Sequence, residues 1–473
     1  MKKLKTVILF IFTSLLILSC RKESFIISPD ARVRITVDTL KYDTVFTTAG
    51  SITQSFKIVN ENNQKLRLTS VKLMGGPGSA YKINVDGTTG PEVNNLEIEA
   101  NDSIYVFAQV NINPTAANLP FIVRDSIQVN YNGTKQLVQL EAFGKNAHFL
   151  RNKQVLVNET WNNDLPYVIL GYLYVDTNQT LTINKGCRIY MHADAPIIVD
   201  GTLLVNGLKD TVDRVYFQGD RLDDPYKDFP ASWPGIYFLG SSINNELNYA
   251  VIKNGYQSIG IQDMPSNAPI PKLTLNECII DNAYDAGIFA INSSIWARNC
   301  LISNCGKNLY LLKGGDYQFT HCTVVSYSNN FIQHKEPVLT LSDVDGTSTA
   351  RLDAIFRNCV FWGENGLLDN EVKILRNGNL PIGSVIFDNV LWKVQTNPAF
   401  ATTIGNIINN QNPLFDSINV SRGYYDFHLK ITPLSPAINK GNPAAGLLTD
   451  LDGKQRPLPV GTNPDLGCFE KQQ

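Results

Sequence analysis

Between residues 31 and 147, apolar and polar residues alternate in short segments separated by turn residues. Val33-Arg-Ile-Thr-Val37 and Ser55-Phe-Lys-Ile-Val59 are two such segments, and Asn132-Gly133 is one of the turns. A period of two buries one side of a strand and leaves the other in water. About seven short strands in roughly 115 residues are typical of two packed antiparallel sheets. We therefore predict an antiparallel β-sandwich over residues 31–147.

From about residue 150 a different pattern repeats: one apolar residue, two polar residues, a small residue, two or three apolar residues, and often Asn. Two successive spacings of the small residue are 22, and the others are longer. A base period near 22 with insertions predicts a β-solenoid, in which coils of three short strands stack on each other. We place it at residues 150–411. The small position is occupied by Ala250, Cys278, Cys300, Cys322, Cys359 and Val390.

Residues 412–473 do not follow the repeat, although they contain Asp450-Leu-Asp452-Gly453 and Asp465-Leu-Gly-Cys-Phe469. A solenoid needs an atypical terminal unit over its open sheet edge, because an open edge can pair with another chain. We therefore expect a C-terminal cap segment that covers this edge. The longest gap between repeats, from Cys322 to Cys359, predicts a corner loop, and corner loops commonly carry binding sites.

The first residues have the pattern of a secretory signal. Lys2, Lys3 and Lys5 precede an apolar run, residues 7–18, that is too short to span a bilayer comfortably. The run ends at Ile17-Leu-Ser-Cys20, which resembles a bacterial lipobox. We predict a lipoprotein signal peptide at residues 1–20, lipid on Cys20 and a tether at residues 21–30. The chain would then be anchored in the cell envelope, at the outer membrane, with the periplasmic or surface side left open.

Composition narrows the possible functions. The formal net charge is -2, and 18% of the residues are charged. Removing the three lysines of the signal brings the mature charge to -5 (-2 - 3). A near-neutral chain without a basic block is a poor nucleic-acid binder, so we expect no nucleic-acid partner. The chain also has 48 Asn residues, a surplus that fits a turn-rich β protein.

Cysteine and histidine give little sign of chemistry. Seven Cys remain after Cys20, and four of them occupy the repeated small position. They could form a metal or disulfide array, but their spacing follows the coil and matches no compact metal site, so we predict core packing. A Cys300–Cys305 disulfide stays open. The sequence has no HExxH, GxSxG, P-loop or Rossmann fingerprint, so we predict no metal and no cofactor.

Three groups of residues together resemble a known family. They are Asp43–Thr48 with Asn101–Tyr105, then Gln218–Arg221 with Trp233–Tyr237, and finally residues 434–441, 450–457 and 464–470. These segments resemble right-handed parallel β-helix lipoproteins of Bacteroidetes-type bacteria, which carry an N-terminal immunoglobulin-like module. The resemblance implies a sandwich followed by a right-handed parallel β-helix with a C-terminal cap. It implies carbohydrate as the substrate class and assigns no catalytic residue.

One acidic cluster is the candidate site. Lyases of the β-helix fold hold calcium with carboxylates and use Arg or Lys as base, and glycosidases of that fold pair two carboxylates. Calcium would matter only for a lyase. The alternative is a charged surface loop whose residues pair locally. The candidate catalytic residues are Asp220, Arg221, Asp223 and Asp224, and the candidate ligand-binding residues are Tyr226, Asp228 and Trp233.

The favoured hypothesis is an envelope lipoprotein whose β-helix presents a surface for glycan binding, without catalysis. Aromatic rings would stack on sugar faces, while Asn and Asp would bind hydroxyl groups. The first alternative is a polysaccharide lyase or glycoside hydrolase that acts on acidic glycans. The second is a structural or adhesive surface protein.

Overall fold

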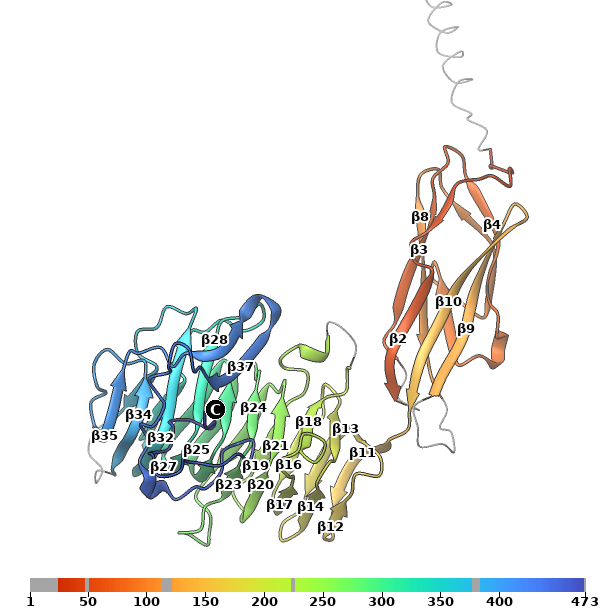
Figure 1. The fold of residues 1–473 in the computed structure, drawn as a ribbon. Helices are drawn as coiled ribbons and strands as arrows, with labels where there is room; N and C mark the ends of the chain where they lie inside the picture. The colour runs from red at the N-terminus through yellow and green to blue at the C-terminus, as the bar shows by residue number, and fades with distance from the viewer. Residues whose placement is uncertain (1–23, 47–50, 113–120, 223–225, 377–382, 472–473) are drawn as a thin grey trace, which may run out of the picture. The chain divides into compact units, whose positions relative to one another are not determined.

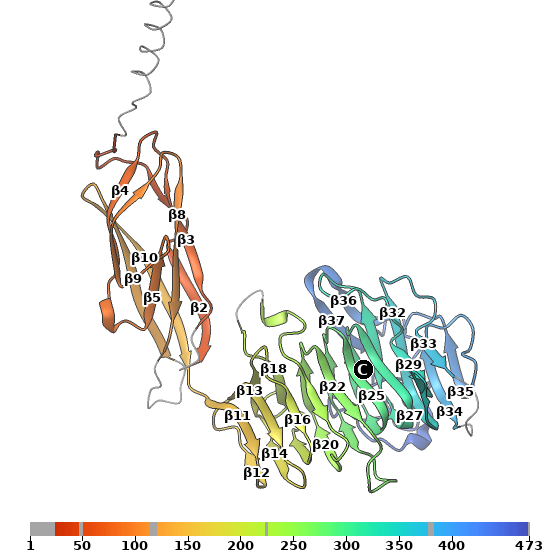
Figure 2. The ribbon, with the colours of Figure 1, turned by 180° about the vertical axis from the view of Figure 1, so that it is seen from behind.

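The computed structural model describes residues 24–46, 51–112, 121–222, 226–376 and 383–471, which form two compact units (Figures 1 and 2). The first unit ends at Asn146 and the second begins at Ala147. These residues form an all-β protein with four single-turn 3-10 helices and no α-helix. Among them, no helix has the length and apolar character of a membrane span. The predicted signal peptide and Cys20 lie outside the described residues. The 3-10 helices are η1 Gly76–Gly78, η2 Tyr226–Asp228, η3 Val420–Arg422 and η4 Pro443–Ala445.

The first unit is the predicted β-sandwich, built from two five-stranded sheets. In β8, Ile104 and Val106 are buried while Tyr105 and Phe107 are exposed, which is the alternation expected of a half-buried strand. The first sheet has the order β1 (Val33–Ile35), β3 (Gln54–Asn60), β8 (Ser103–Val110), β5 (Tyr81–Val85), β6 (Thr88–Thr89). The second has the order β2 (Thr39–Phe46), β10 (Thr134–Lys145), β9 (Phe121–Tyr131), β4 (Leu66–Leu73), β7 (Glu92–Ile98).

One strand pair of the sandwich is parallel. β1 pairs antiparallel with β3 in the first sheet, whereas the next strand, β2, pairs parallel with β10 in the second. The chain therefore crosses from one sheet to the other between Ile35 and Thr39, and β2 runs in the same direction as the strand it joins. The predicted β-sandwich is confirmed. It departs from an antiparallel arrangement in the parallel pairing of the edge strand β2 with β10.

The second unit contains a 23-stranded sheet in which every strand pair is parallel, the arrangement of a β-helix. A strand usually pairs with the third strand after it, as in β16–β19–β22, so each coil has three sides. We call them face A (such as β16, β19 and β22), face B (such as β17, β20 and β23) and face C (such as β18, β21 and β24). The longer strands β25, β27, β32, β34 and β35 bend around a corner and contribute to two faces.

The strands of the β-helix have the following bounds: β11 His148–Val155, β12 Glu159–Trp161, β13 Tyr167–Val175, β14 Thr180–Asn184, β15 Arg188–Met191, β16 Ile197–Val199, β17 Thr202–Asn206, β18 Val215–Gly219, β19 Ile236–Phe238, β20 Asn245–Asn248, β21 Ala250–Lys253, β22 Gln257–Gln262, β23 Leu273–Asn276, β24 Ile279–Asp281, β25 Ala286–Arg298, β26 Leu301–Ser303, β27 Lys307–Thr320, β28 Thr323–Tyr327, β29 Leu339–Ser342, β32 Leu352–Glu364, β33 Val372–Leu375, β34 Val385–Trp392 and β35 Ala401–Asn409. The short hairpin β30 (Val344–Asp345) and β31 (Ser348–Thr349) lies in the insertion before β32.

The repeated small position is an interior ladder, as predicted. All six of its residues are fully buried, and Cys359 pairs directly with Val390 on the next coil. The seven described cysteines are free and buried, so Cys300 and Cys305 form no disulfide. Burial raises the pKa of the thiols of Cys278, Cys300 and Cys322, which keeps them protonated. Core packing is therefore their role.

Asparagine occupies many of the corners of the coils, including three of the six positions just before the repeated small residue. The residue just before the small position has a positive φ in every repeat, for example 49° at Asn299 and 57° at Asn358. Asn adopts this left-handed conformation more readily than most residues. Asn amides also bond between coils, with Asn282 Nδ2 donating to Asn254 Oδ1 at 2.8 Å. The Asn surplus thus has a structural cause.

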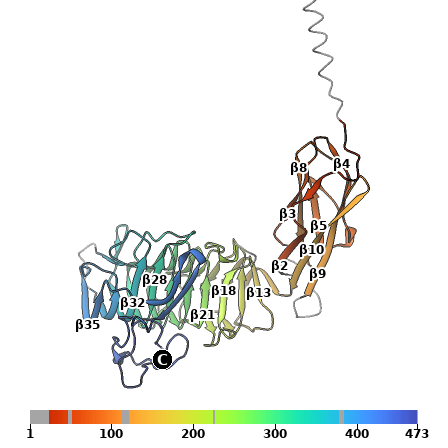
Figure 3. The same ribbon diagram turned by 45° about the horizontal axis from the view of Figure 1, so that its top comes forward.

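The C-terminal segment lies on the outer side of face C (Figure 3). It contains the hairpin of β36 (Phe415–Asn419) and β37 (Tyr424–Leu429) and then irregular chain. Its apolar side chains, such as Phe427 and Leu466, pack against outward-facing residues of face C, such as Val325 and Trp362. The expectation of a cap over the terminal edge is therefore corrected: the segment covers the flank of the last coils, because that flank is apolar on both of its sides.

A buried ion pair fastens this segment to the coils. Arg456 and Glu470 have fully buried side chains and meet at 2.9 Å (Nε to Oε2). Arg456 also donates to Asn299 Oδ1 at 2.7 Å, which joins the segment to a corner of the β-helix. Glu470 in turn accepts from the backbone N–H groups of Leu458 and Asp465. A buried charge pair needs such additional hydrogen bonds, because both ions lose their water.

A half-buried histidine makes a second attachment. His428 lies between two carboxylates, with Nδ1 2.6 Å from Asp426 Oδ1 and Nε2 3.0 Å from Asp452 Oδ2. Asp452 also accepts from Arg214 of the β-helix at 3.1 Å. Hydrogen bonding to Asp452 and Asp426 raises the pKa of His428. The imidazolium form satisfies both carboxylates at once, since both of its ring nitrogens then donate.

Candidate functional site

The predicted cluster lies in the insertion between β18 and β19, at the corner that joins face C to face A. Side chains of the Asn ladder hold this insertion in place. Asn254 Nδ2 donates to the carbonyl of Lys227 at 2.7 Å, and Asn282 Nδ2 donates to that of Asp228 at 2.9 Å. The repeat therefore positions a segment that does not itself repeat.

The candidate catalytic residues have separate partners. Asp220 Oδ2 lies 2.7 Å from His192 Nδ1, and the Arg221 guanidinium lies over the Tyr226 ring, 3.5 Å from its centroid. Asp223 and Asp224 lie outside the described residues. Asp228 is exposed. Among the described residues, the partner of Asp220 is His192 and no second carboxylate contacts it.

Sequence reasoning missed His192, which precedes Asp220 by 28 residues and stands on the preceding coil. A carboxylate bonded to one imidazole nitrogen orients the ring, and the other nitrogen can then accept or donate a proton. The His192 side chain is 52% exposed. Within the described part of the chain, no group of three or more His, Cys, Asp or Glu residues is placed to hold a metal.

The prediction that Trp233 binds ligand is corrected by its burial. Its side chain is 1% exposed and belongs to the core of the β-helix, where the indole N–H donates to the Lys253 carbonyl at 2.8 Å. A ring buried in this way offers no face to a sugar. The sequence placed Trp233 in a polar surface loop, whereas the insertion turns inward at this residue and closes the coil.

Four exposed aromatic rings gather at the corner between faces C and A. They come from the insertion after β18, from the two following turns of the corner, and from the loop after β28. Of seven exposed aromatic rings among the described residues of this unit, the other three are Trp296, Phe400 and Tyr424. We call the group, together with the half-buried Phe229, the aromatic corner. Its exposed members are Tyr226 (40% exposed), Tyr256 (45%), Tyr284 (52%) and Phe331 (47%).

The rings of the aromatic corner form two contacting sets. The Tyr226, Phe229 and Phe331 rings make a chain, with centroids 5.1 and 4.9 Å apart. Tyr256 and Tyr284 stand on adjacent coils, and their roughly parallel rings lie 6.0 Å apart. The first set joins two insertions that are about a hundred residues apart in sequence, because both leave the β-helix at the same corner.

Polar groups border the rings. Asp285, next to Tyr284, accepts from Lys307 Nζ at 2.8 Å and from Gln257 Nε2 at 2.7 Å. Lys307 also lies over the ring of Tyr310, 4.9 Å from its centroid. A surface with flat apolar rings beside carboxylate, amide and ammonium groups can contact both the faces and the hydroxyl groups of a sugar.

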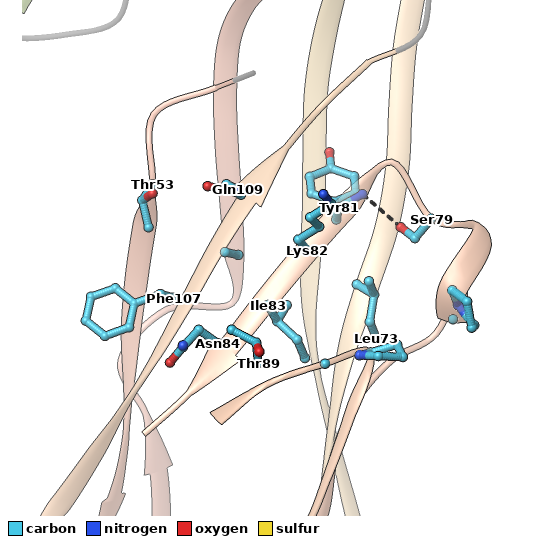
Figure 4. Close-up of a pocket in the computed structure, with 15 residues that line it drawn as sticks. Thr53, Leu73, Ser79, Tyr81, Lys82, Ile83, Asn84, Thr89, Phe107 and Gln109 are labelled. Atoms are coloured by element: carbon cyan, nitrogen blue, oxygen red, sulfur yellow. Dashed lines mark hydrogen bonds between the residues drawn. The ribbon is translucent and has the colours of Figure 1, made fainter. Parts of the chain in front are cut away.

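The first unit contains a cavity of about 770 Å³ beside β5 and β8 (Figure 4). Its lining is mostly apolar and includes Leu73, Ile83 and Phe107. The hydroxyl group at its edge, on Ser79, donates to the carboxylate of Asp125 and accepts from the Tyr81 N–H. None of the residues predicted from the sequence to form a site lines this cavity.

The fold and the site define an all-β protein with a parallel β-helix whose corner carries exposed aromatic rings. No protein-family model and no curated protein matches the chain. Solved structures that match include a family 123 glycoside hydrolase from Clostridium perfringens (10% identity, 26% of this chain, 30% of that chain, TM-score 0.18). The PapD-like domain 7 of human CEP192 matches at 8% identity over 27% of this chain and 96% of that chain, with a TM-score of 0.17.

A third match is the alkylpurine DNA glycosylase AlkC of Pseudomonas fluorescens (14% identity, 24% of this chain, 31% of that chain, TM-score 0.16). The chain thus spans about 30% of the length of the glycoside hydrolase it matches. Likenesses at these scores carry no argument about function, which depends on the residues of the chain itself.

Proposed function

We propose that this chain is a lipid-anchored envelope protein whose β-helix binds glycans at the aromatic corner, without catalysis. The observation that carries the proposal is the concentration of exposed rings at one corner, beside the polar group of Asp285, Lys307 and Gln257. Contiguous exposed apolar patches mark interaction sites, whereas single exposed apolar side chains do not. The lipobox at Cys20 supports the anchor.

Catalysis is left out because Asp220 and Arg221 face different partners. A retaining or inverting glycosidase needs two carboxyl groups across the scissile bond, and a lyase needs a base beside a cation-bound uronate. Asp220 bonds to His192, while Arg221 lies over Tyr226. One of these contacts reaches the preceding coil and the other stays within the insertion.

Glycan binding is tested with the purified protein on an array that includes uronate-containing polysaccharides. We expect one class of glycan to bind, and Tyr284→Ala to weaken that binding at least about tenfold, because removing a stacking ring costs about 1.4 kcal/mol or more. The matched control is Trp296→Ala, since Trp296 is also exposed but stands on face B, away from the corner. Equal loss in both variants, or binding to no glycan, would contradict the proposal and favour the adhesive alternative.

The non-catalytic part has its own test. The protein is incubated with each bound glycan, and unsaturated or reducing ends are measured. Release that disappears in Asp220→Ala would replace the binding proposal with the lyase or hydrolase alternative. The anchor is tested by incorporation of a labelled fatty acid, which Cys20→Ala is expected to abolish.

A further inference from the structure

The last strand of the β-helix leaves one sheet edge open. β35 ends the strand order and, within the described residues, pairs only with β34. The C-terminal segment packs on face C, where it contacts Ile408 of β35 and accepts a hydrogen bond from Asn406 Nδ2 at the Lys440 carbonyl, but among the described residues it forms no strand pairing with β35. Much of β35 is solvent-exposed, including Ile404, which is 49% exposed. An open edge presents unpaired backbone N–H and C=O groups to any extended chain that can reach it.

This edge has little of the usual protection, apart from an irregularity in its pairing with β34 beside Gly405. Proteins that must stay single block open edges with charged side chains, proline or bulges. No charged residue occurs from Val394 to Phe415, and no proline occurs within β35. β35 also contains Thr402, Thr403 and three isoleucines, residues that favour strand pairing. Two copies of this edge can therefore approach each other without charge repulsion.

The strand is compatible with pairing to itself. β35 bends at Gly405, where φ is 70°, so that its first half lies on face B and its second half on face C. A two-fold axis through Gly405 exchanges the halves and places Ala401 opposite Asn409 and Thr403 opposite Ile407. Ala401 and Thr403 pair with the buried Val385 and Phe387 of β34 and therefore face the interior. Ile407 and Asn409 pair with the buried Val390 and Trp392 and face the interior as well.

The axis thus sets inward-facing residues opposite inward-facing residues, as a continuous core requires. It also sets outward-facing Thr402 and Ile404 opposite outward-facing Ile408 and Asn406. A register shifted by one residue would place core positions opposite solvent positions.

We propose that two copies of this chain associate end to end by antiparallel pairing of their β35 strands, with Gly405 on the two-fold axis. Such an interface is isologous and closes at two copies. It continues the β-helix core across the dimer and removes the open edge from each copy.

The experiment measures mass by sedimentation equilibrium of the full-length protein in a density-matched detergent. We expect a mass of two chains. Ile404→Lys is expected to shift it to one chain, because two lysines would then lie close to the axis. The matched control Ile270→Lys changes an isoleucine that is 52% exposed on a loop between β22 and β23, and it should retain two chains. A wild-type mass of one chain overturns the proposal, and so does a mass of two chains in Ile404→Lys.

The register is tested by disulfide cross-linking in a mixture of two single variants. Ile404→Cys mixed with Asn406→Cys should give a covalent dimer on mild oxidation, because the axis places these positions opposite each other. Ile404→Cys mixed with Ile270→Cys should not. The native thiols described here are buried and should not react. A covalent dimer in the control mixture alone would exclude this register.

Discussion

The outer side of face C and the aromatic corner lie on neighbouring and partly shared coils, yet one is covered and the other is bare. Leu301, Val325 and Trp362 point outward from face C and are buried by the C-terminal segment. Tyr256 and Tyr284, only a few residues beyond face C on each coil, stay about half exposed. The C-terminal segment therefore buries the apolar outer side of face C and leaves the aromatic corner exposed. Apolar surface that a protein leaves bare beside a covered one is available for a partner.

This comparison predicts different consequences for substitutions in the two regions. Changes under the C-terminal segment should reduce the stability of the fold. Changes on the exposed rings should reduce binding while leaving the fold intact. Three substitutions test the division, from the largest expected effect to the smallest.

Arg456→Met should have the largest effect. It leaves the Glu470 carboxylate fully buried without its cation, and breaking a buried pair in this way costs about 3–5 kcal/mol. Urea unfolding followed by near-UV circular dichroism measures the loss. The control is Arg351→Met, which breaks an exposed pair with Asp353 and should cost far less, because water screens an exposed ion pair. Equal losses in the two variants would show that the segment is not fastened by Arg456.

Trp233→Ala tests where the covered region ends. Trp233 lies in the insertion between β18 and β19, but its ring belongs to the core of the β-helix. Its removal should therefore cost about 3 kcal/mol or more through the cavity it leaves. Trp296→Ala, on an exposed ring, should change the unfolding free energy by less than about 1 kcal/mol. A small loss for Trp233→Ala, with lost glycan binding, would return Trp233 to the binding surface.

The attachment of the C-terminal segment should be stronger at pH 6 than at pH 8. The folded pKa of His428 is raised, so its contribution is complete below its ordinary value of 6.5 and is lost as the pH rises through the folded pKa. Burial, and then Glu470, raise the pKa of Asp465 to about 6 from 3.8, so stability also falls as the pH rises from about 4 to 6.

Hydrogen exchange of amides in β36 and β37 measures this opening. His428→Gln should cost about 1 kcal/mol at pH 6 and should weaken the dependence above pH 6, because it removes one titrating group. Protection factors, which correct for the faster intrinsic exchange at higher pH, should be larger at pH 6, and equal protection factors at both pH values in the unmodified protein would contradict the role of His428.

The sequence predicts the β-helix well because each coil needs a small apolar side chain at the same interior position. Cys278, Cys300 and Cys322 fill one interior position, so the period is visible in the letters alone. The parallel pairing of β2 with β10 and the position of the C-terminal segment depend on contacts between distant residues, and no local pattern encodes them. Lys272 is a similar case: it is fully buried because its ammonium donates to the carbonyls of Leu239, Gly240 and Gln262.

The site was predicted only in part. The insertion at residues 220–233 does reach the corner, but its inward Trp233 and outward Tyr226 cannot be told apart by residue type. Tyr256 and Tyr284 each stand six residues after the repeated small position, at Ala250 and Cys278, so the repeat could have indicated this pair. Phe331 lies in an insertion and does not share that spacing. The common feature of all three is the corner of the solenoid at which each segment leaves, and that is a property of the folded chain.

The β-helix contains two uninterrupted coils, residues 278–299 and 300–321, which show how its length could change by whole coils. Each is 22 residues long and begins at the same small interior position, so either could be duplicated or removed without changing the pattern of its neighbours. Every such change would move β35 by about 4.8 Å along the axis, the spacing between adjacent strands. The number of such coils therefore sets the length of the β-helix, and the coil at residues 278–299 also carries Tyr284 of the aromatic corner.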